Sequence, residues 1–281
     1  MKFIPQFSAL SLVLSGIAGA SEMIEAVHLK EAGSFKDPKA AYWSRSQPLQ
    51  VSTLPQVVAT PNQVKPTVLA LQVRAVHNGQ WLGFLIEWQD PTLDNRLMID
   101  KFGDQVAVEL PTRYVQGGSD PMPSPMMGNP GGRVSIMQWR AAFQQDLVVG
   151  EPKLRDLYPY AWVDVYPDQV MRTTDARPYM GAAGLDNPIS HPLNTPVLDQ
   201  MAEGWGSLTV KAEQNANGWG YWKDGWWHVA ITRPLVSNSD NDPQLQSGSQ
   251  TVAAFAVWDG GSQEVGSRKG WTNWVPLHLD D

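Results

Sequence analysis

The residues from Leu71 to Trp88 run LQVRAVHNGQWLGFLIEW, and this stretch decides the fold class. Two runs rich in Val, Leu, Ile and aromatic residues flank the pair Asn78-Gly79. Asn-Gly between two such runs is the strongest short signal for a β-hairpin, because the turn needs positive φ angles that Asn and Gly tolerate best. The stretch therefore predicts two antiparallel strands, over residues 68–76 and 81–88, joined by a tight turn.

Similar short runs recur along the rest of the chain, between segments rich in Gly, Pro and Asn. Further strands are expected over residues 105–110, 134–143, 161–165, 208–212, 226–232, 251–258 and 274–279. Periodicity alone fits a short helix over 134–143 equally well, and no other segment stands out as an amphipathic helix. Long loops are expected over 116–132 and 172–196, and loops of that length are commonly functional. The pattern predicts an all-β protein, either an antiparallel sandwich or a barrel.

The composition excludes several classes of function. The formal net charge is −7 over 281 residues and Lys and Arg form no cluster, which argues against binding to nucleic-acid phosphates. The absence of Cys rules out disulfides, iron–sulfur ligation, thiolate zinc sites and covalent haem attachment by this chain. No Ser lies in a Gly-x-Ser-x-Gly motif, and no two of the five His have the close spacing of a zinc site. The sequence therefore offers no recognisable nucleophile or zinc centre.

Local pattern also predicts the surroundings of four polar side chains. His77 lies in the predicted hairpin turn and is expected to be exposed, whereas His228, within the strand 226–232, is expected to be hydrogen-bonded. Asp240 and Asp242 lie in a polar loop and are expected to be solvated.

The first twenty residues resemble a secretory signal peptide. Lys2 gives a positive start, an apolar run extends over residues 7–17, and Ala18-Gly19-Ala20 forms a small-residue cleavage site. The apolar run is too short to be a good membrane span. We expect cleavage after Ala20, export to the periplasm, and one domain over residues 21–281.

Two places could supply a soft metal ligand. The loop 116–132 carries Met122, Met126 and Met127, whose thioethers suit haem iron, although Met side chains also commonly fill gaps under loops. Lys269 lies between two apolar strands in a Trp-rich segment, where desolvation would favour a neutral amine able to bind a metal. An exposed turn Lys is the alternative, and the pattern alone leaves both interpretations open.

Motifs that follow one another along nearly all of the mature chain resemble a known family. They are Tyr42-Trp43, Leu54-Pro55-Gln56, the hairpin 71–92, Phe102 to Pro111, Met126-Met127-Gly128, Val134 to Ala141, Asp186-Asn187-Pro188, Ala202 to Thr209, Asp224 to Leu235, Phe255 to Gly260 and Gly266-Ser267-Arg268-Lys269. In this order they resemble the haem b-binding γ subunits of the ethylbenzene dehydrogenase, dimethylsulfide dehydrogenase, selenate reductase and chlorate reductase group. Residues 158–187 do not align tightly with that family.

The resemblance implies a sandwich of two antiparallel sheets with long loops and a few short helices. It implies one non-covalent, six-coordinate haem b per chain, with Met127 and Lys269 as axial ligands, and no catalysis by this chain. Met126 is the alternative to Met127, and Lys211 and Lys223 are weaker alternatives to Lys269. The implied partners are an iron–sulfur β subunit, a molybdopterin-containing α subunit reached through it, and a soluble cytochrome.

Two other functions fit the same residues. A carbohydrate-binding module with a related sandwich fold could use the 13 Trp to stack on sugar rings, and a free-standing haem b carrier or sensor would need no partner subunit. The presence of Met127 and Lys269 favours the electron-transfer subunit over the carbohydrate-binding module, since a sugar binder needs neither residue.

Overall fold

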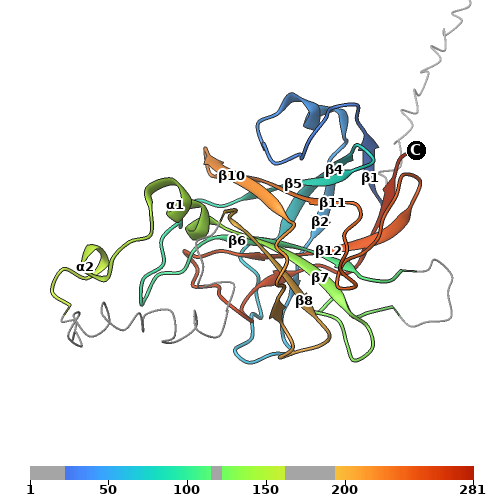
Figure 1. Cartoon of the computed structure of the whole chain (residues 1–281). Helices are drawn as coiled ribbons and strands as arrows, with labels where there is room; N and C mark the ends of the chain where they lie inside the picture. The colour runs from blue at the N-terminus through green and yellow to red at the C-terminus, as the bar shows by residue number, and fades with distance from the viewer. Residues whose placement is uncertain (1–22, 115–121, 162–193) are drawn as a thin grey trace, which may run out of the picture.

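The computed structural model of the chain describes residues 23–114, 122–161 and 194–281 (Figure 1). The expected leader lies outside these ranges, as do the motif Asp186-Asn187-Pro188, most of the loop 172–196 and all of the predicted strand 161–165 except Ala161. No helix within the described ranges combines the length and the apolar character that a membrane crossing needs.

Short strands make up most of the ordered elements. The strands are β1 (Ile24–His28), β2 (Leu49–Ser52), β3 (Leu54–Pro55), β4 (Ala70–His77), β5 (Trp81–Gln89), β6 (Gln105–Pro111), β7 (Val134–Arg140), β8 (Val197–Ala202), β9 (Thr209–Val210), β10 (Asn217–Lys223), β11 (Trp226–Pro234), β12 (Gln250–Trp258), β13 (Gly270–Trp271) and β14 (Val275–Leu279). The helices are the 3-10 turn η1 (Ala41–Arg45) and the α-helices α1 (Ala141–Val149) and α2 (Leu154–Leu157).

The strands form two layers that share one strand, and the predicted sandwich is confirmed. The first layer has the order β10-β11-β5-β4-β1-β14-β12, and the second has the order β12-β6-β7-β8-β9. Residues 250–253 of β12 pair with β14, and residues 254–258 pair with β6. In Figure 1, β10, β5 and β4 lie above β7 and β8. One feature differs from a purely antiparallel pattern, because β1 runs parallel to both β4 and β14.

Both tight hairpins follow from their turn residues. The predicted β4–β5 hairpin is confirmed, but only Gly79 has a positive φ, of 81°, while Asn78 uses its Oδ1 to accept hydrogen bonds from the backbone N–H groups of Gln80 and Trp81. The β10–β11 hairpin has the two-residue turn Asp224-Gly225, with φ of 53° and 80°. Positive φ at both positions is what a type I′ turn requires.

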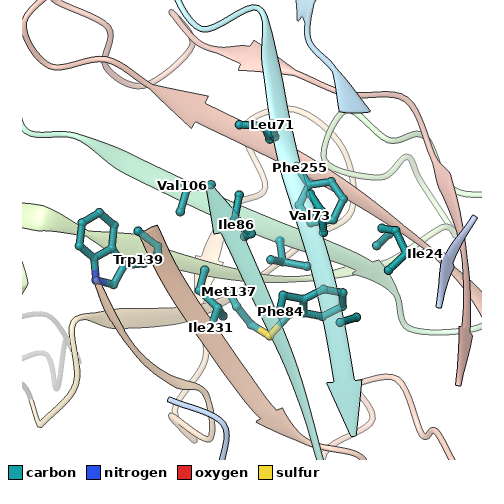
Figure 2. Close-up of a cluster of buried hydrophobic side chains, with 14 of the residues drawn as sticks. Ile24, Leu71, Val73, Phe84, Ile86, Val106, Met137, Trp139, Ile231 and Phe255 are labelled. Atoms are coloured by element: carbon teal, nitrogen blue, oxygen red, sulfur yellow. The ribbon is translucent and has the colours of Figure 1, made fainter. Parts of the chain in front are cut away.

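The hydrophobic core lies between the two layers. Alternate residues of β4 and β5 face alternate residues of β6, β7 and β12, because side chains along a strand point to opposite faces. Figure 2 shows Val73, Phe84, Val106, Met137 and Phe255 gathered in this layer. Phe84 and Phe255 meet edge to face with ring centroids 6.1 Å apart. The core therefore fills the side of β6, β7 and β12 that faces the first layer, and leaves their other face free.

Three local expectations are wrong or incomplete. β10 was not expected, because its glycines weaken a strand pattern; Gly220 is needed since a Cβ there would lie 2.6 Å from Cζ2 of Trp139. The segment 134–143, for which a strand and a short helix were alternatives, contains both: strand β7 ends at Arg140 and helix α1 begins at Ala141.

His77 is fully buried, because the ring of His28 in the neighbouring strand β1 stacks on its ring with centroids 4.9 Å apart. The hydrogen bond expected for His228 is confirmed, with Glu87 at 2.6 Å.

Phe255→Ala is expected to lower the free energy of unfolding by about 3–5 kcal/mol, because it leaves a cavity in the core between the two sheets. Leu69→Ala is the control, since that side chain is 71% exposed and its loss should change stability by less than about 0.5 kcal/mol. Urea denaturation measures both. Equal, small losses in the two variants would contradict a core centred on Phe255.

Candidate functional site

A cavity of about 520 Å³ lies on the outer face of the second layer. Strand alternation builds it: Val106 and Val108 of β6 point into the core, so that Gln105, Ala107 and Glu109 point into the cavity. The same alternation exposes one face of β7, β8 and β12 to it. Three of the residues that line the cavity on this sheet face are the small Ala107, Ala254 and Ala256. Their short side chains leave room for a large apolar ligand.

Met127 lines the cavity from the loop between β6 and β7. Its backbone has φ 68° and that of Gly128 has φ 73°, two left-handed residues in succession that turn the chain sharply. Gly128 is required, since a Cβ there would collide with the backbone oxygen of Gly132. The carbonyl of Met127 accepts a hydrogen bond of 2.8 Å from the N–H of Gly204, and the side chain packs on a cluster that includes Trp258.

Met126 lines the same cavity, so that the two Met of the Met-Met-Gly motif remain alternatives. Met122 is 40% exposed and is not among the lining residues.

Lys269 lines the cavity from the turn before β13. Its Nζ lies 5.2 Å from the ring centroid of Trp258. Two hydrogen bonds hold this turn in place. The carbonyl of Gly266 accepts one from the indole N–H of Trp258, and the carbonyl of Ser267 accepts the other from the side-chain amide of Gln56. Burial lowers the pKa of Lys269, against the raising effect of the nearby Glu109 carboxyl, and so favours the neutral amine.

Glu109 is the site residue that sequence reasoning missed. Its side chain is buried, and its Oε1 has no hydrogen-bond partner. Burial raises its pKa to about 8, although the charge of Lys269 and the backbone N–H of Met127 act in the opposite direction. Both proposed ligands therefore lie near this carboxyl. The available signal was the alternation of β6, which puts Glu109 on the face of Gln105 and Ala107.

Polar side chains line another part of the cavity. The Gln138 Oε1 accepts hydrogen bonds from Arg140 (2.9 Å) and Gln200 (3.0 Å), while its Nε2 donates to Gln105 (2.7 Å). Burial lowers the pKa of Arg140, and its Nε is buried without a hydrogen-bond partner. The cavity thus combines apolar walls, a thioether, an amine and a guanidinium that could meet an anionic group of a ligand.

The weaker Lys alternatives lie elsewhere. Lys211 is buried and bridges Asp199 (2.5 Å) and Asp242 (2.6 Å), so its charge is already paired. Asp242 is therefore buried, and the expectation that it is solvated is wrong, whereas Asp240 is exposed as expected. Lys223 is 72% exposed and lies 3.9 Å from Asp224. Neither Lys lines the cavity.

Known proteins match the chain at the level of family, relatives and fold. The family model described as ethylbenzene dehydrogenase matches residues 40–270. The chlorate reductase subunit gamma of Ideonella dechloratans is 24% identical over 88% of this chain and 81% of its own length. The candidate respiratory nitrate reductase haem subunit ORF7 of Haloferax mediterranei is 29% identical over 41% of this chain, and the chain covers only 43% of that relative.

A solved structure also matches. It is a family 9 carbohydrate-binding module from Caldicellulosiruptor kristjanssonii in complex with glucose, with a TM-score of 0.43 and 9% identity over 92% of this chain and 95% of its own.

Glu109→Gln is expected to change how stability depends on pH in the chain without a bound cofactor. Between the ordinary pKa of 4.5 and the folded value of about 8, the folded state holds a proton that the unfolded state has lost. The free energy of unfolding of the parent should therefore fall as pH rises through this range. Gln cannot ionise, so the variant should be the more stable protein at pH 8, by at most about 5 kcal/mol.

Urea denaturation at several pH values measures this difference. Lys269 acts in the opposite direction in both proteins, because its lowered pKa makes stability rise with pH, and loss of the Glu109 charge can only steepen that rise in the variant. Parallel pH profiles for the two proteins would mean that Glu109 does not titrate in a buried state.

Proposed function

The chain belongs to the ethylbenzene dehydrogenase family, and from that premise we propose that it is an electron-transfer subunit holding one non-covalent haem b between Met127 and Lys269. The observation that carries the proposal is that these two side chains, from segments far apart in the sequence, line the same cavity. A neutral thioether and a desolvated amine are ligands that iron accepts.

The cavity fits a flat, largely apolar group. The alanines on its sheet face leave space for the group, and the side chains of Trp258 and Trp271 line it with apolar surface. Arg140 is a half-buried cation near which the carboxylates of a haem b could be accommodated. The absence of Cys agrees with a haem that is held without covalent attachment.

Met127 and Lys269 would hold such a group through its iron, and the group would supply one-electron transfer and not substrate binding. The protein's own residues set the conditions. Met127 favours the reduced iron, because a thioether ligand raises the potential. Lys269 can bind iron only as a neutral amine, and burial favours that form.

Glu109 contributes through its own protonation. A charged carboxylate near Lys269 would stabilise the ammonium form and oppose ligation. Burial raises the pKa of Glu109 to about 8 and keeps this carboxyl neutral near pH 7, which removes that opposition. Glu109 therefore acts as a positioning residue for the charge state of Lys269.

We further propose that the chain is a non-catalytic part of a larger complex. The names of the relatives, a chlorate reductase γ subunit and a nitrate reductase haem subunit, support association with a reductase. The proposed partners are an iron–sulfur β subunit, a molybdopterin-containing α subunit behind it, and a soluble cytochrome. The leader-like residues 1–20 support export to the periplasm with cleavage after Ala20.

Met127→Ala and Lys269→Ala are each expected to convert a low-spin haem spectrum into a high-spin one, because each removes one axial ligand. Met122→Ala and Lys223→Ala are the matched controls: both side chains are exposed, and the first comes from the same loop as Met127. Visible and electron paramagnetic resonance spectra of the full chain report the outcome. Met126→Ala tests the alternative Met in the same way.

Wild-type spectra from both Met127→Ala and Lys269→Ala would overturn the ligand assignment. A second readout is the midpoint potential of Met127→His. This variant should stay low-spin but have a lower potential than the parent, since an imidazole favours the reduced iron less than a thioether does.

A further inference from the structure

Three buried carboxylates meet at one end of the sandwich, and one of them, Asp104, also lines the large cavity. Asp90 follows β5, Asp104 precedes β6, and Asp259 follows β12. One carboxylate oxygen from each lies within 4.8 Å of the others. The exposed fractions of the three residues are 1%, 0% and 3%. Strand ends from both layers of the fold therefore bring three acids together away from water.

One of these carboxylates is only half satisfied. The Asp90 Oδ1 accepts hydrogen bonds from the backbone N–H (3.0 Å) and hydroxyl (3.3 Å) of Thr92, but its Oδ2 is buried without a partner. The indole N–H of Trp88 lies near this carboxyl and lowers its pKa, yet it makes no hydrogen bond. A buried carboxylate oxygen left without a donor is costly, which points to a missing ligand.

A fourth carboxylate, that of the half-buried Asp94, lies beside the group without being part of the close triad. The Asp94 Oδ2 is also buried without a hydrogen-bond partner. It lies beside Asp259: a Cβ built on Gly261 would come within 2.9 Å of the Asp94 Oδ2 and 3.3 Å of the Asp259 Oδ1. Gly261 thus leaves open a small space that the two carboxylates border.

No cation of the described chain offsets this charge. The donors to the group are neutral: the backbone N–H groups of Thr92, Asp94, Gly260 and Ser262, the hydroxyls of Thr92 and Ser262, and the indole of Trp227. Over residues 23–114, 122–161 and 194–281, none of the four acids lies within 4.0 Å of a Lys, Arg or His nitrogen. Burial, and then mutual repulsion, raise the pKa of Asp104 to about 8, and burial raises that of Asp90 to about 6.

We propose that Asp90, Asp104 and Asp259, with Asp94 beside them, bind one Ca²⁺ ion. An all-oxygen set without His or Cys suits a hard cation rather than zinc. Loop carboxylates of varied orientation suit Ca²⁺ better than Mg²⁺, which demands a small octahedral cage. The ion would offset the buried charge and tie the 90–104 loop to the turn after β12. That loop also supplies Leu97 and Gly103 to the large cavity, but the proposal does not depend on what the cavity binds.

Calcium titration of the full-length chain tests this proposal. After chelation with EDTA and exchange into metal-free buffer, calorimetry should show one Ca²⁺ per chain, with a Kd of about 10⁻⁶ M or tighter. Calcium at a hundredfold excess over Kd should raise the Tm by about 5 °C. Asp90→Asn and Asp259→Asn should each weaken binding at least tenfold, whereas Asp240→Asn, at an exposed loop position, should bind as the parent does.

The parent protein alone can overturn the proposal, so a variant that fails to fold does not prevent a decision. If calcium gives no heat and no change in Tm even at a pH well above 8, where burial no longer keeps Asp104 protonated, the group does not bind calcium and the proposal is wrong. Unchanged binding by Asp90→Asn and Asp259→Asn would place the ion elsewhere, for example at Glu25, His278 and Asp280. Tighter binding of Mg²⁺ than of Ca²⁺ would contradict the choice of metal.

Discussion

Strand β12 is the element on which the rest of the structure depends, because both sheets pair with it. Its first residues continue the layer of β14, and its last residues continue the layer of β6. Because side chains alternate along the strand, its two faces lie in different environments. Phe255 and Val257 fill the core between the layers, while Ala256 and Trp258 form part of the cavity. Asp259, the next residue, enters the buried carboxylate group. One strand therefore fixes the core, the candidate cofactor site and the candidate cation site relative to one another.

Removal of water determines the chemistry at both sites. In the cavity, burial acts on one acid and one base and favours the neutral form of each, and the neutral form of Lys269 is the one that the proposed haem binding needs. In the carboxylate group, burial acts on acids alone, and no neighbouring base offsets them within the described residues. The buried charge there needs either protons or a cation. Lys211 shows the third solution, a buried cation whose charge two aspartates offset.

Much of the fold follows from the sequence, because strand period and turn residues are local signals. The β4–β5 hairpin and the strands β6, β11, β12 and β14 lie close to where the pattern predicts them. The exceptions have identifiable causes, of which the first is local and the second is not. The glycines of β10 weaken its pattern, and the burial of His77 depends on β1, a strand distant in the sequence. The site is less predictable. Met127 and Lys269 come from a family resemblance and not from spacing. The alternation of β6 places Glu109 on the face of Gln105 and Ala107, but only the fold brings Lys269 close to it. No single segment carries a signal for the carboxylate group.

We propose that the cavity of this chain holds a haem b for electron transfer. The most direct test is a visible spectrum of the purified full-length chain, oxidised and then reduced with dithionite, together with a pyridine haemochrome assay. The account predicts a sharp low-spin b-type spectrum and about one haem per chain. A colourless protein that also fails to bind added haemin would contradict it, and binding of sugars by the exposed Trp side chains would then be the next function to measure.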